Sequence, residues 1–284
     1  MSVLITAAFL YWRGWDVNWL LALWATVGII LFHAAGNLIS DYYDYKKGID
    51  AEDTFGSKTI TGGLLTPKQT IVFGWVMLLL ACVNGVGLVL CTGYGLLVFG
   101  LLGALFTLLY PWMKAHALGD LDILIEYGLL PALGTAYAVC GYQGGFALAL
   151  FSLYLDALMI VPAFATITMA VLHTNNTRDV ATDRRAGIKT FAMLIGREHS
   201  IAVYIVELAL PIIWVLMLTV QGTMPVYAVC VLALIKPVSA CCKQAILLEK
   251  DEHAMDTLDE KTAQLQLMNG ILLIVFMLIG HFAA

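Results

Sequence analysis

Long stretches of this 284-residue sequence contain no Asp, Glu, Lys or Arg, and they dominate its pattern of apolar and polar positions. Five of them cover residues 69–113, 127–155, 157–177, 208–235 and 262–284. A helix that crosses a bilayer needs about 20 mostly apolar residues, so the first stretch is long enough for two such helices. The pattern predicts an all-α protein that crosses a lipid bilayer several times.

We expect a polytopic bundle of about nine transmembrane helices. It should form a single domain over residues 1–284, with a central cavity that opens to the cytoplasmic side. The first expected span is too short to cross a bilayer and looks like the second half of a helix, so we expect the start of the chain to be truncated. The expected spans are 2–12, 18–44, 69–91, 95–113, 121–141, 149–177, 200–220, 224–244 and 264–282.

The composition excludes a water-soluble core. Only 12% of the residues are charged and 61% are hydrophobic, whereas soluble domains carry about 25% charged residues. The net charge of −5 is small and indicates no class of partner; we expect no nucleic-acid partner. The six cysteines show no C-x-x-C spacing, and we expect them to be small apolar packing residues.

Basic residues gather in alternate loops of this predicted bundle. With the expected spans, the loops that contain residues 46–68, 114, 178–197 and 243–261 lie on one side and hold nearly all the Lys and Arg. The opposite loops carry none apart from Arg13. Basic loops face the cytoplasm, so the sequence predicts a multi-pass protein of the cell's inner (cytoplasmic) membrane.

Asn37, Asp41 and Asp44 lie at the expected end of the second span. Their spacings of four and three residues put all three side chains on one helical face. Carboxylates at the end of a membrane helix are costly unless a positive charge compensates them. Mg²⁺ would do so, because it takes oxygen ligands and commonly lies between carboxylates and a phosphate.

The same pattern recurs at the end of another apolar run, in Asn175, Asp179 and Asp183. Two acidic helix ends that face each other could hold a pair of metal ions over one diphosphate. The alternative is that each is a solvated helix end with polar flanking residues. The recurrence favours a shared site, because internal symmetry in membrane proteins tends to mark one.

Three basic residues are candidates to bind an anion at this site. Lys58 and Lys189 lie in glycine-bearing loops that follow the two acidic clusters, where backbone N–H groups could help to bind a diphosphate. The alternative for Lys58 is an ordinary cytoplasmic connector. Arg178 precedes Asp179, so on a helix it points about 100° away and could instead pair with a neighbouring carboxylate.

Single polar residues inside the expected spans are weaker signals. His33 and His173 are more often hydrogen-bonded interior histidines than ligands. Glu126 and Glu207 are functional candidates, because a carboxylate within a membrane span is costly. Two further carboxylates begin an expected span, where a helix N-terminus favours them in any case: Asp120 and Asp122.

With these motifs in place, the chain resembles the UbiA superfamily of intramembrane aromatic prenyltransferases over nearly its whole length. Residues 37–50 are similar to the first aspartate-rich motif of the menaquinone branch, and residues 175–190 to the second. Residues 61–67 resemble a short Gly-Leu-x-Thr/Ser-Pro phrase that follows the first motif. Ser40 stands where many bacterial members have Asn. Gly48 stands where the 4-hydroxybenzoate branch has Asp, and this second departure favours the naphthoate branch.

The resemblance implies a Mg²⁺-dependent enzyme that transfers a polyprenyl group from a polyprenyl diphosphate to an aromatic acid. The expected acceptor is 1,4-dihydroxy-2-naphthoate, which would lose CO₂ in menaquinone biosynthesis. The implied catalytic residues are Asp41, Asp44, Asp179 and Asp183. The implied Mg²⁺ ligands are these four and Asn37, and the implied diphosphate-binding residues are Asn37, Lys58, Asn175, Arg178 and Lys189.

Two alternatives stay open at this point. One is prenyl transfer to a different aromatic acceptor, such as a hydroxybenzoate, homogentisate or a chlorophyll precursor. The other is an ion-coupled transporter, which should place its acidic residues near the bilayer midplane in broken helices. The acidic residues here are expected at helix ends beside basic loops, which favours the enzyme.

Overall fold

The structure, a computed structural model, describes residues 1–48, 55, 58–140, 148–185, 187–249 and 251–283. Asp50, the last residue of the first motif, lies outside the described residues. In the described part of the chain every element is helical, and the single β-bridge joins His116 to Lys189. The expected all-α fold is confirmed.

The elements run along the chain in one series. They are α1 (Ser2–Trp12), α2 (Trp19–Lys47), α3 (Lys58–Thr61), α4 (Pro67–Thr92), α5 (Leu96–Ala115), α6 (Gly119–Ile123), the π-helical η1 (Leu124–Leu129), α7 (Leu130–Cys140), α8 (Leu148–Met159), α9 (Pro162–Arg178), α10 (Val180–Arg185), α11 (Phe191–Ile195), α12 (Arg197–Val220), the 3₁₀ segment η2 (Val226–Leu234), α13 (Ile235–Ile246), the short 3₁₀ turns η3 (Leu247–Glu249) and η4 (Glu252–Met255), and α14 (Leu258–Ala283).

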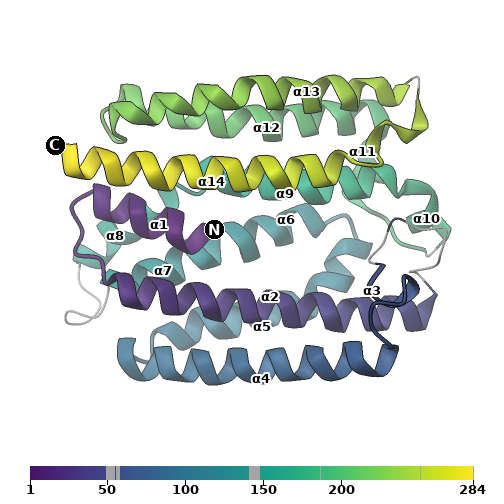
Figure 1. Cartoon of the computed structure of the whole chain (residues 1–284), viewed down its shortest axis with the longest axis horizontal. Helices are drawn as coiled ribbons and strands as arrows, with labels where there is room; N and C mark the ends of the chain where they lie inside the picture. The colour runs from purple at the N-terminus through teal and green to yellow at the C-terminus, as the bar shows by residue number, and fades with distance from the viewer. Residues whose placement is uncertain (49–54, 56–57, 141–147, 186, 250, 284) are drawn as a thin grey trace.

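The long helices lie roughly parallel to one another along the longest axis of the molecule (Figure 1). Helix α2 packs along α4, and α9 packs against both α12 and α14. The C-terminal end of α2, the short α3 and α10 lie at the same end of the bundle (Figure 1). The arrangement therefore brings the ends of two helices that are distant in sequence to one end of the molecule.

The number of membrane spans is lower than expected. By length and composition, seven helical segments of the described chain can cross a membrane, or eight if a bent pair counts as one. That pair is 151–159 with 162–178, bent by 51°, where the sequence predicted one span over 149–177. Pro162 begins the second helix of the pair, and a proline cannot continue a helix because it lacks an N–H donor and clashes with the preceding turn.

Helix α1 has a different place from the one expected. It has only 11 residues, and most of them are buried, including Phe9 and Leu10 at 0% exposure. It packs against α14, α7 and α2. A helix that is apolar on all sides lies either in a protein core or in lipid, and the burial of α1 against other helices shows that it forms part of the core. By contrast, α4 and α5 expose large apolar side chains such as Leu79 and Leu108, as a lipid-facing surface does.

The Thr66-Pro67 phrase has a local structural role at the start of α4. Gln69 N–H donates to Thr66 Oγ1 at 3.3 Å, and Thr66 N–H donates back to Gln69 Oε1 at 2.9 Å. This reciprocal cap satisfies donors that a helix start leaves open, and Pro67 suits the first helical position. The cap therefore sets where the loop after α2 ends.

Small residues let α2 and α4 approach closely. A Cβ added at Gly74 of α4 would lie 2.8 Å from Ile39 Cγ1, and one added at Gly87 would lie 2.6 Å from the Trp24 ring. Ile39 lies between Asn37 and Asp41, so this contact also positions the first acidic cluster.

We predict that Gly74→Val lowers the stability of the fold by about 1–3 kcal/mol, the usual cost of overpacking, because its side chain has no room against Ile39. The measurement is thermal unfolding of the purified protein in detergent. The matched control is Gly85→Val on the same helix, where an added Cβ meets nothing within 4 Å. Equal unfolding temperatures for the two variants would contradict this packing.

Candidate active site

The first acidic cluster lies on the last turns of α2. The helix ends at Gly48, whose φ of 71° allows the left-handed C-cap. Within the cluster, Ser40 Oγ donates to Asp44 Oδ2 at 3.3 Å. Asn37 Nδ2 lies 3.3 Å from His33 Nε2, and His33 Nδ1 is hydrogen-bonded to the Tyr127 hydroxyl at 2.8 Å. The cluster is thus fixed to η1, which comes from a distant part of the sequence.

The second acidic cluster spans the junction of α9 and α10. Asp179 N–H donates to Asn175 O and Asp183 N–H donates to Asp179 O, both at 2.8 Å, so the helical spacing continues through the break at Asp179. Asn175 Oδ1 and Asp183 Oδ2 are buried and have no hydrogen-bond partner among the residues that the structure describes. Buried polar atoms are nearly always paired in native proteins. These two oxygens therefore fit a site that binds a ligand or a cation.

Arg178 does pair with neighbouring carboxylates, the alternative that the sequence left open. Its Nε and Nη2 donate to the two Asp179 oxygens at 2.8 and 3.1 Å, and its Nη1 donates to Asp259 Oδ2 at 2.9 Å. The guanidinium carbon also lies 4.6 Å from the centre of the Phe55 ring. Phe55 belongs to the loop after α2, so the segment that follows the first cluster reaches the second.

The structure places Lys58 and Lys189, the two lysines predicted to bind the diphosphate, in different surroundings. Lys58 begins α3 and is exposed. Lys189 lies beside the end of α5, where its N–H donates to Ala115 O at 3.3 Å and its backbone pairs with that of His116. Helices α3 and α10 lie at the same end of the bundle (Figure 1).

Lys114 is a further basic residue of this region, and the sequence reasoning missed it. Burial raises the pKa of Asp183, and the charge of Lys114 opposes that rise while the charge of Asp179 adds to it. Lys114 at the end of α5 therefore lies close to the second cluster. Its only signal in the sequence is a lone lysine at the end of an apolar run.

Polar side chains inside the bundle extend from the first cluster. Thr107 Oγ1 donates to Glu126 Oε1 at 2.6 Å, and Glu126 precedes the Tyr127 that bonds to His33. Glu126 and Tyr127 lie in the π-helical η1, and π-helical turns occur often at functional sites. Glu126 was a weak candidate from sequence; Thr107 and Tyr127 carried no signal.

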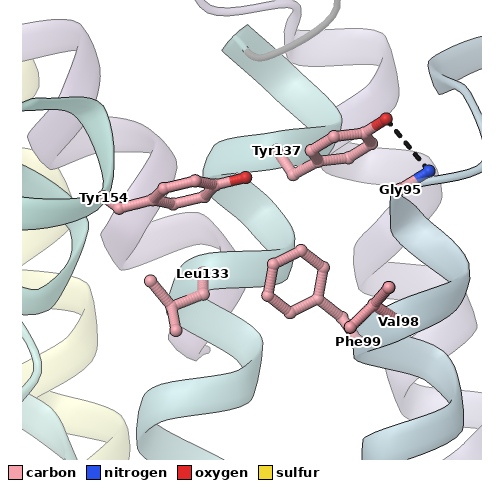
Figure 2. Close-up of a pocket in the computed structure, with 6 residues that line it drawn as sticks. All are labelled: Gly95, Val98, Phe99, Leu133, Tyr137 and Tyr154. Carbon is pink, nitrogen blue, oxygen red and sulfur yellow. Dashed lines mark hydrogen bonds between the residues drawn. The ribbon is translucent and has the colours of Figure 1, made fainter. Parts of the chain in front are cut away.

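A separate cavity of about 280 Å³ lies far along the same helices, near the start of α5 (Figure 2). Gly95, Val98, Phe99, Leu133, Tyr137 and Tyr154 line it. Gly95 N–H donates to the Tyr137 hydroxyl at 3.1 Å, and the two tyrosine rings and Phe99 enclose an apolar space. Gly95 is 19 residues before Lys114, which on a helix corresponds to roughly 28 Å.

A comparison with protein-family models matches residues 1–254 to the UbiA prenyltransferase family. The chain belongs to this family. Membership supports prenyl transfer from a prenyl diphosphate to an aromatic acceptor, and it favours the enzyme over a transporter. The transmembrane helices agree with a multi-pass membrane protein.

Curated relatives of this UbiA-family chain include animal proteins named UbiA prenyltransferase domain-containing protein 1. The mouse protein is 36% identical over 261 residues, which covers 88% of this chain and 71% of the relative. The human protein is 36% identical over 255 residues, covering 86% and 69%. The similarity thus points to the family, and it does not single out a dihydroxynaphthoate polyprenyltransferase.

Two solved structures share the fold. A UbiA homolog from Aeropyrum pernix K1 has a TM-score of 0.70 at 14% identity and covers 98% of this chain and 96% of its own. A digeranylgeranylglyceryl phosphate synthase structure has a TM-score of 0.52 at 17% identity, covering 97% and 92%. At these identities the likeness concerns the fold alone.

We predict that Lys114→Gln destabilises this UbiA-family chain by about 1 kcal/mol at alkaline pH and by less at acidic pH. Lys114 stabilises only the ionised form of Asp183. Because the pKa of Asp183 is raised, its ionisation in the folded chain costs free energy at pH values above the ordinary pKa of an aspartate, and this cost disappears as the pH falls and Asp183 takes up a proton. The stabilisation by Lys114 disappears with the charge on Asp183, so the substitution has less effect at low pH. The measurement is the thermal midpoint from about pH 5 to pH 8 in chelator.

The control for this prediction is Lys68→Gln, which removes an exposed lysine at the start of α4. It should shift the midpoint little at any pH. A loss that is the same for Lys114→Gln at every pH would contradict the contact with Asp183.

Proposed function

We propose that this UbiA-family enzyme transfers a polyprenyl group from a polyprenyl diphosphate to 1,4-dihydroxy-2-naphthoate, with loss of CO₂, in menaquinone biosynthesis. We place it in the cell's inner (cytoplasmic) membrane, with both acidic clusters on the cytoplasmic side. The observation that carries the proposal is that the ends of α2 and α9 lie at one end of the bundle (Figure 1). Buried oxygens of Asn175 and Asp183 there lack partners among the described residues.

The residues present suit Mg²⁺, which takes oxygen ligands and dehydrates reluctantly. Asn37, Asp41 and Asp44 would hold it on one side, and Asp179 and Asp183 on the other. The unpaired Asp183 Oδ2 is the observation that supports this fit. When bound, the metal supplies positive charge that stabilises the leaving diphosphate.

The basic residues of the chain would orient the diphosphate. Lys58 and Lys189 come from the loops after the two clusters, and Lys114 from the end of α5. Cationic donors aimed at the phosphate oxygens stabilise the charge that develops as the bond between the prenyl carbon and oxygen breaks. Arg178 is held by Asp259, and in our proposal it moves from Asp179 to the diphosphate as substrate binds.

The prenyl cation would then form a bond to the ring carbon of the acceptor that carries the carboxylate. The C–C bond to the carboxylate breaks, its electron pair returns to the ring, and CO₂ leaves. We place the acceptor against His33, Glu126 and Tyr127, whose hydrogen bonds join the first cluster to η1. Polar groups of this wall would orient the ring hydroxyls. The apolar helices exclude water, which would otherwise trap the cation.

The apolar cavity of Figure 2 is suited to the far part of the prenyl tail. It lies on α5, which ends at Ala115 beside Lys114, and on α7 and α8, and its lining is apolar and aromatic. A tail anchored at the acidic clusters would run along these helices to reach it.

We predict that the purified protein forms product from a polyprenyl diphosphate and 1,4-dihydroxy-2-naphthoate only when Mg²⁺ is present. Asp41→Asn and Asp179→Asn should each lower kcat by about 10²–10³, the usual loss when one group that stabilises developing charge is removed. The measurement is a product assay by mass spectrometry, run beside a hydroxybenzoate and homogentisate.

The control is Glu198→Gln, which changes an exposed carboxylate at the start of α12 and should leave the rate unchanged. Product with a different acceptor alone would overturn the proposed substrate. Full activity of both aspartate variants would overturn the proposed site.

We predict that Asp259→Asn raises the Mg²⁺ concentration needed for half-maximal activity by about fivefold, or about 1 kcal/mol. Without Asp259, Arg178 pairs with Asp179 alone and competes more strongly with the metal for that carboxylate. The measurement is a Mg²⁺ titration of the rate. Glu260→Gln, the adjacent exposed position, should not change the titration, and an unchanged titration for Asp259→Asn would show that Arg178 does not compete.

A further inference from the structure

Three buried polar side chains meet where α6, α9 and α12 pack together. They are Asp120 in the first turn of α6, His173 in α9 and Glu207 in the middle of α12. Their ligating atoms all lie within 4.8 Å of one another. Asp120 and Glu207 are each 7% exposed and His173 is 0% exposed. This cluster is separate from the two acidic helix ends, and the proposed reaction does not use it.

The hydrogen bonds around His173 favour a proton on Nε2. Nε2 lies 3.1 Å from the main-chain oxygen of Ser200, which can only accept, and 2.8 Å from the Ser200 hydroxyl. Because Thr177 Oγ1 donates its hydrogen to His173 O, the Ser200 hydroxyl can donate to Thr177 and accept from His173 Nε2. Nδ1 of the neutral ring then presents a lone pair, and it lies 3.0 Å from Asp120 Oδ1. Two lone pairs at that distance repel each other unless a proton or a metal ion lies between them.

The charges around this gap favour a divalent ion. Asp120 Oδ2 and Glu207 Oε2 are buried and have no hydrogen-bond partner within the described part of the chain. Among the described residues, no Lys or Arg forms an ion pair with either carboxylate. Burying two such charges is costly unless they are compensated. One proton on His173 would leave a surplus negative charge, whereas a divalent cation balances both carboxylates.

We propose that Asp120, His173 and Glu207 form a second metal site that binds one Zn²⁺ ion. One imidazole nitrogen and two carboxylates are ligands that Zn²⁺ takes, at about 2.0–2.2 Å. In tetrahedral geometry two ligands at such distances lie about 3.3–3.6 Å from each other. His173 Nδ1 and Asp120 Oδ1, which are 3.0 Å apart, would separate by a few tenths of an ångström to bind the ion. A metal-bound histidine usually donates its other N–H to a carbonyl or a carboxylate, as His173 does to Ser200.

The site would fasten the helix that leads to the second acidic cluster. The ion ties α9 to α6 and α12, and Ser200 Oγ is hydrogen-bonded to Thr177 Oγ1 at 2.6 Å. Thr177 lies two residues before Asp179. A bound ion at His173 therefore stiffens α9 one to two turns before Asp179, and it stabilises the folded chain because the unfolded chain has no such site.

The test is metal analysis of the untagged, full-length protein purified in detergent and dialysed with Zn²⁺ and then without it. We expect about one Zn²⁺ per chain in the wild type and in Asp41→Asn, since the proposed site is distinct from the acidic helix ends. Glu207→Gln and His173→Gln should each retain less than a tenth of that amount. The matched control is Glu198→Gln, an exposed carboxylate on the same helix, which should retain all of it.

A second measurement keeps the proposal testable if the two variants fail to fold. Added Zn²⁺ should raise the thermal midpoint of chelator-treated wild-type protein by several degrees, and added Mg²⁺ should not reproduce that rise at the same concentration. Co²⁺ in place of Zn²⁺ should give visible absorption bands. Wild-type protein with no retained Zn²⁺ and no rise in midpoint would overturn the site and show that protons neutralise the cluster. Full retention of Zn²⁺ by Glu207→Gln would also overturn the site.

Discussion

Charge compensation at one end of the helix bundle is the constraint on which the rest of the structure depends. Carboxylates at the ends of membrane helices must find positive partners or donors. Arg178 partly compensates Asp179, and Lys114 partly compensates Asp183. The compensation is incomplete, because buried oxygens of Asn175 and Asp183 have no partner among the described residues. In our proposal, a metal ion bound together with a diphosphate supplies the missing positive charge.

The remaining helices make such a site possible. The tight contact of α2 with α4 holds the first cluster in place, and the buried α1 fills the centre of the bundle against α14 and α7. Helix α9 follows the bend after α8, and it ends at the same end of the molecule as α2 (Figure 1). Apolar surfaces that face lipid exclude water from the interior, where a reactive prenyl cation would need protection.

The sequence predicted the fold class, most of the helices and the two acidic helix ends, because each depends on residues close together in the chain. It missed features that depend on tertiary packing. Lys114 is 69 residues from Asp183, and Asp259 is 81 residues from Arg178, so no local spacing could reveal either pair. Likewise Asp120, His173 and Glu207 come from three helices. Pro162 is a sequence signal for the break between α8 and α9, but the long charge-free run around it led to the prediction of a single span.

The most direct measurement is a structure of the enzyme with Mg²⁺ and a prenyl thiodiphosphate that cannot be cleaved readily. We expect density for metal ions that join one diphosphate to Asp41 and Asp44 on one side and to Asp179 and Asp183 on the other. A diphosphate held by a single acidic helix end, or bound with no metal between it and the carboxylates, would contradict the shared site.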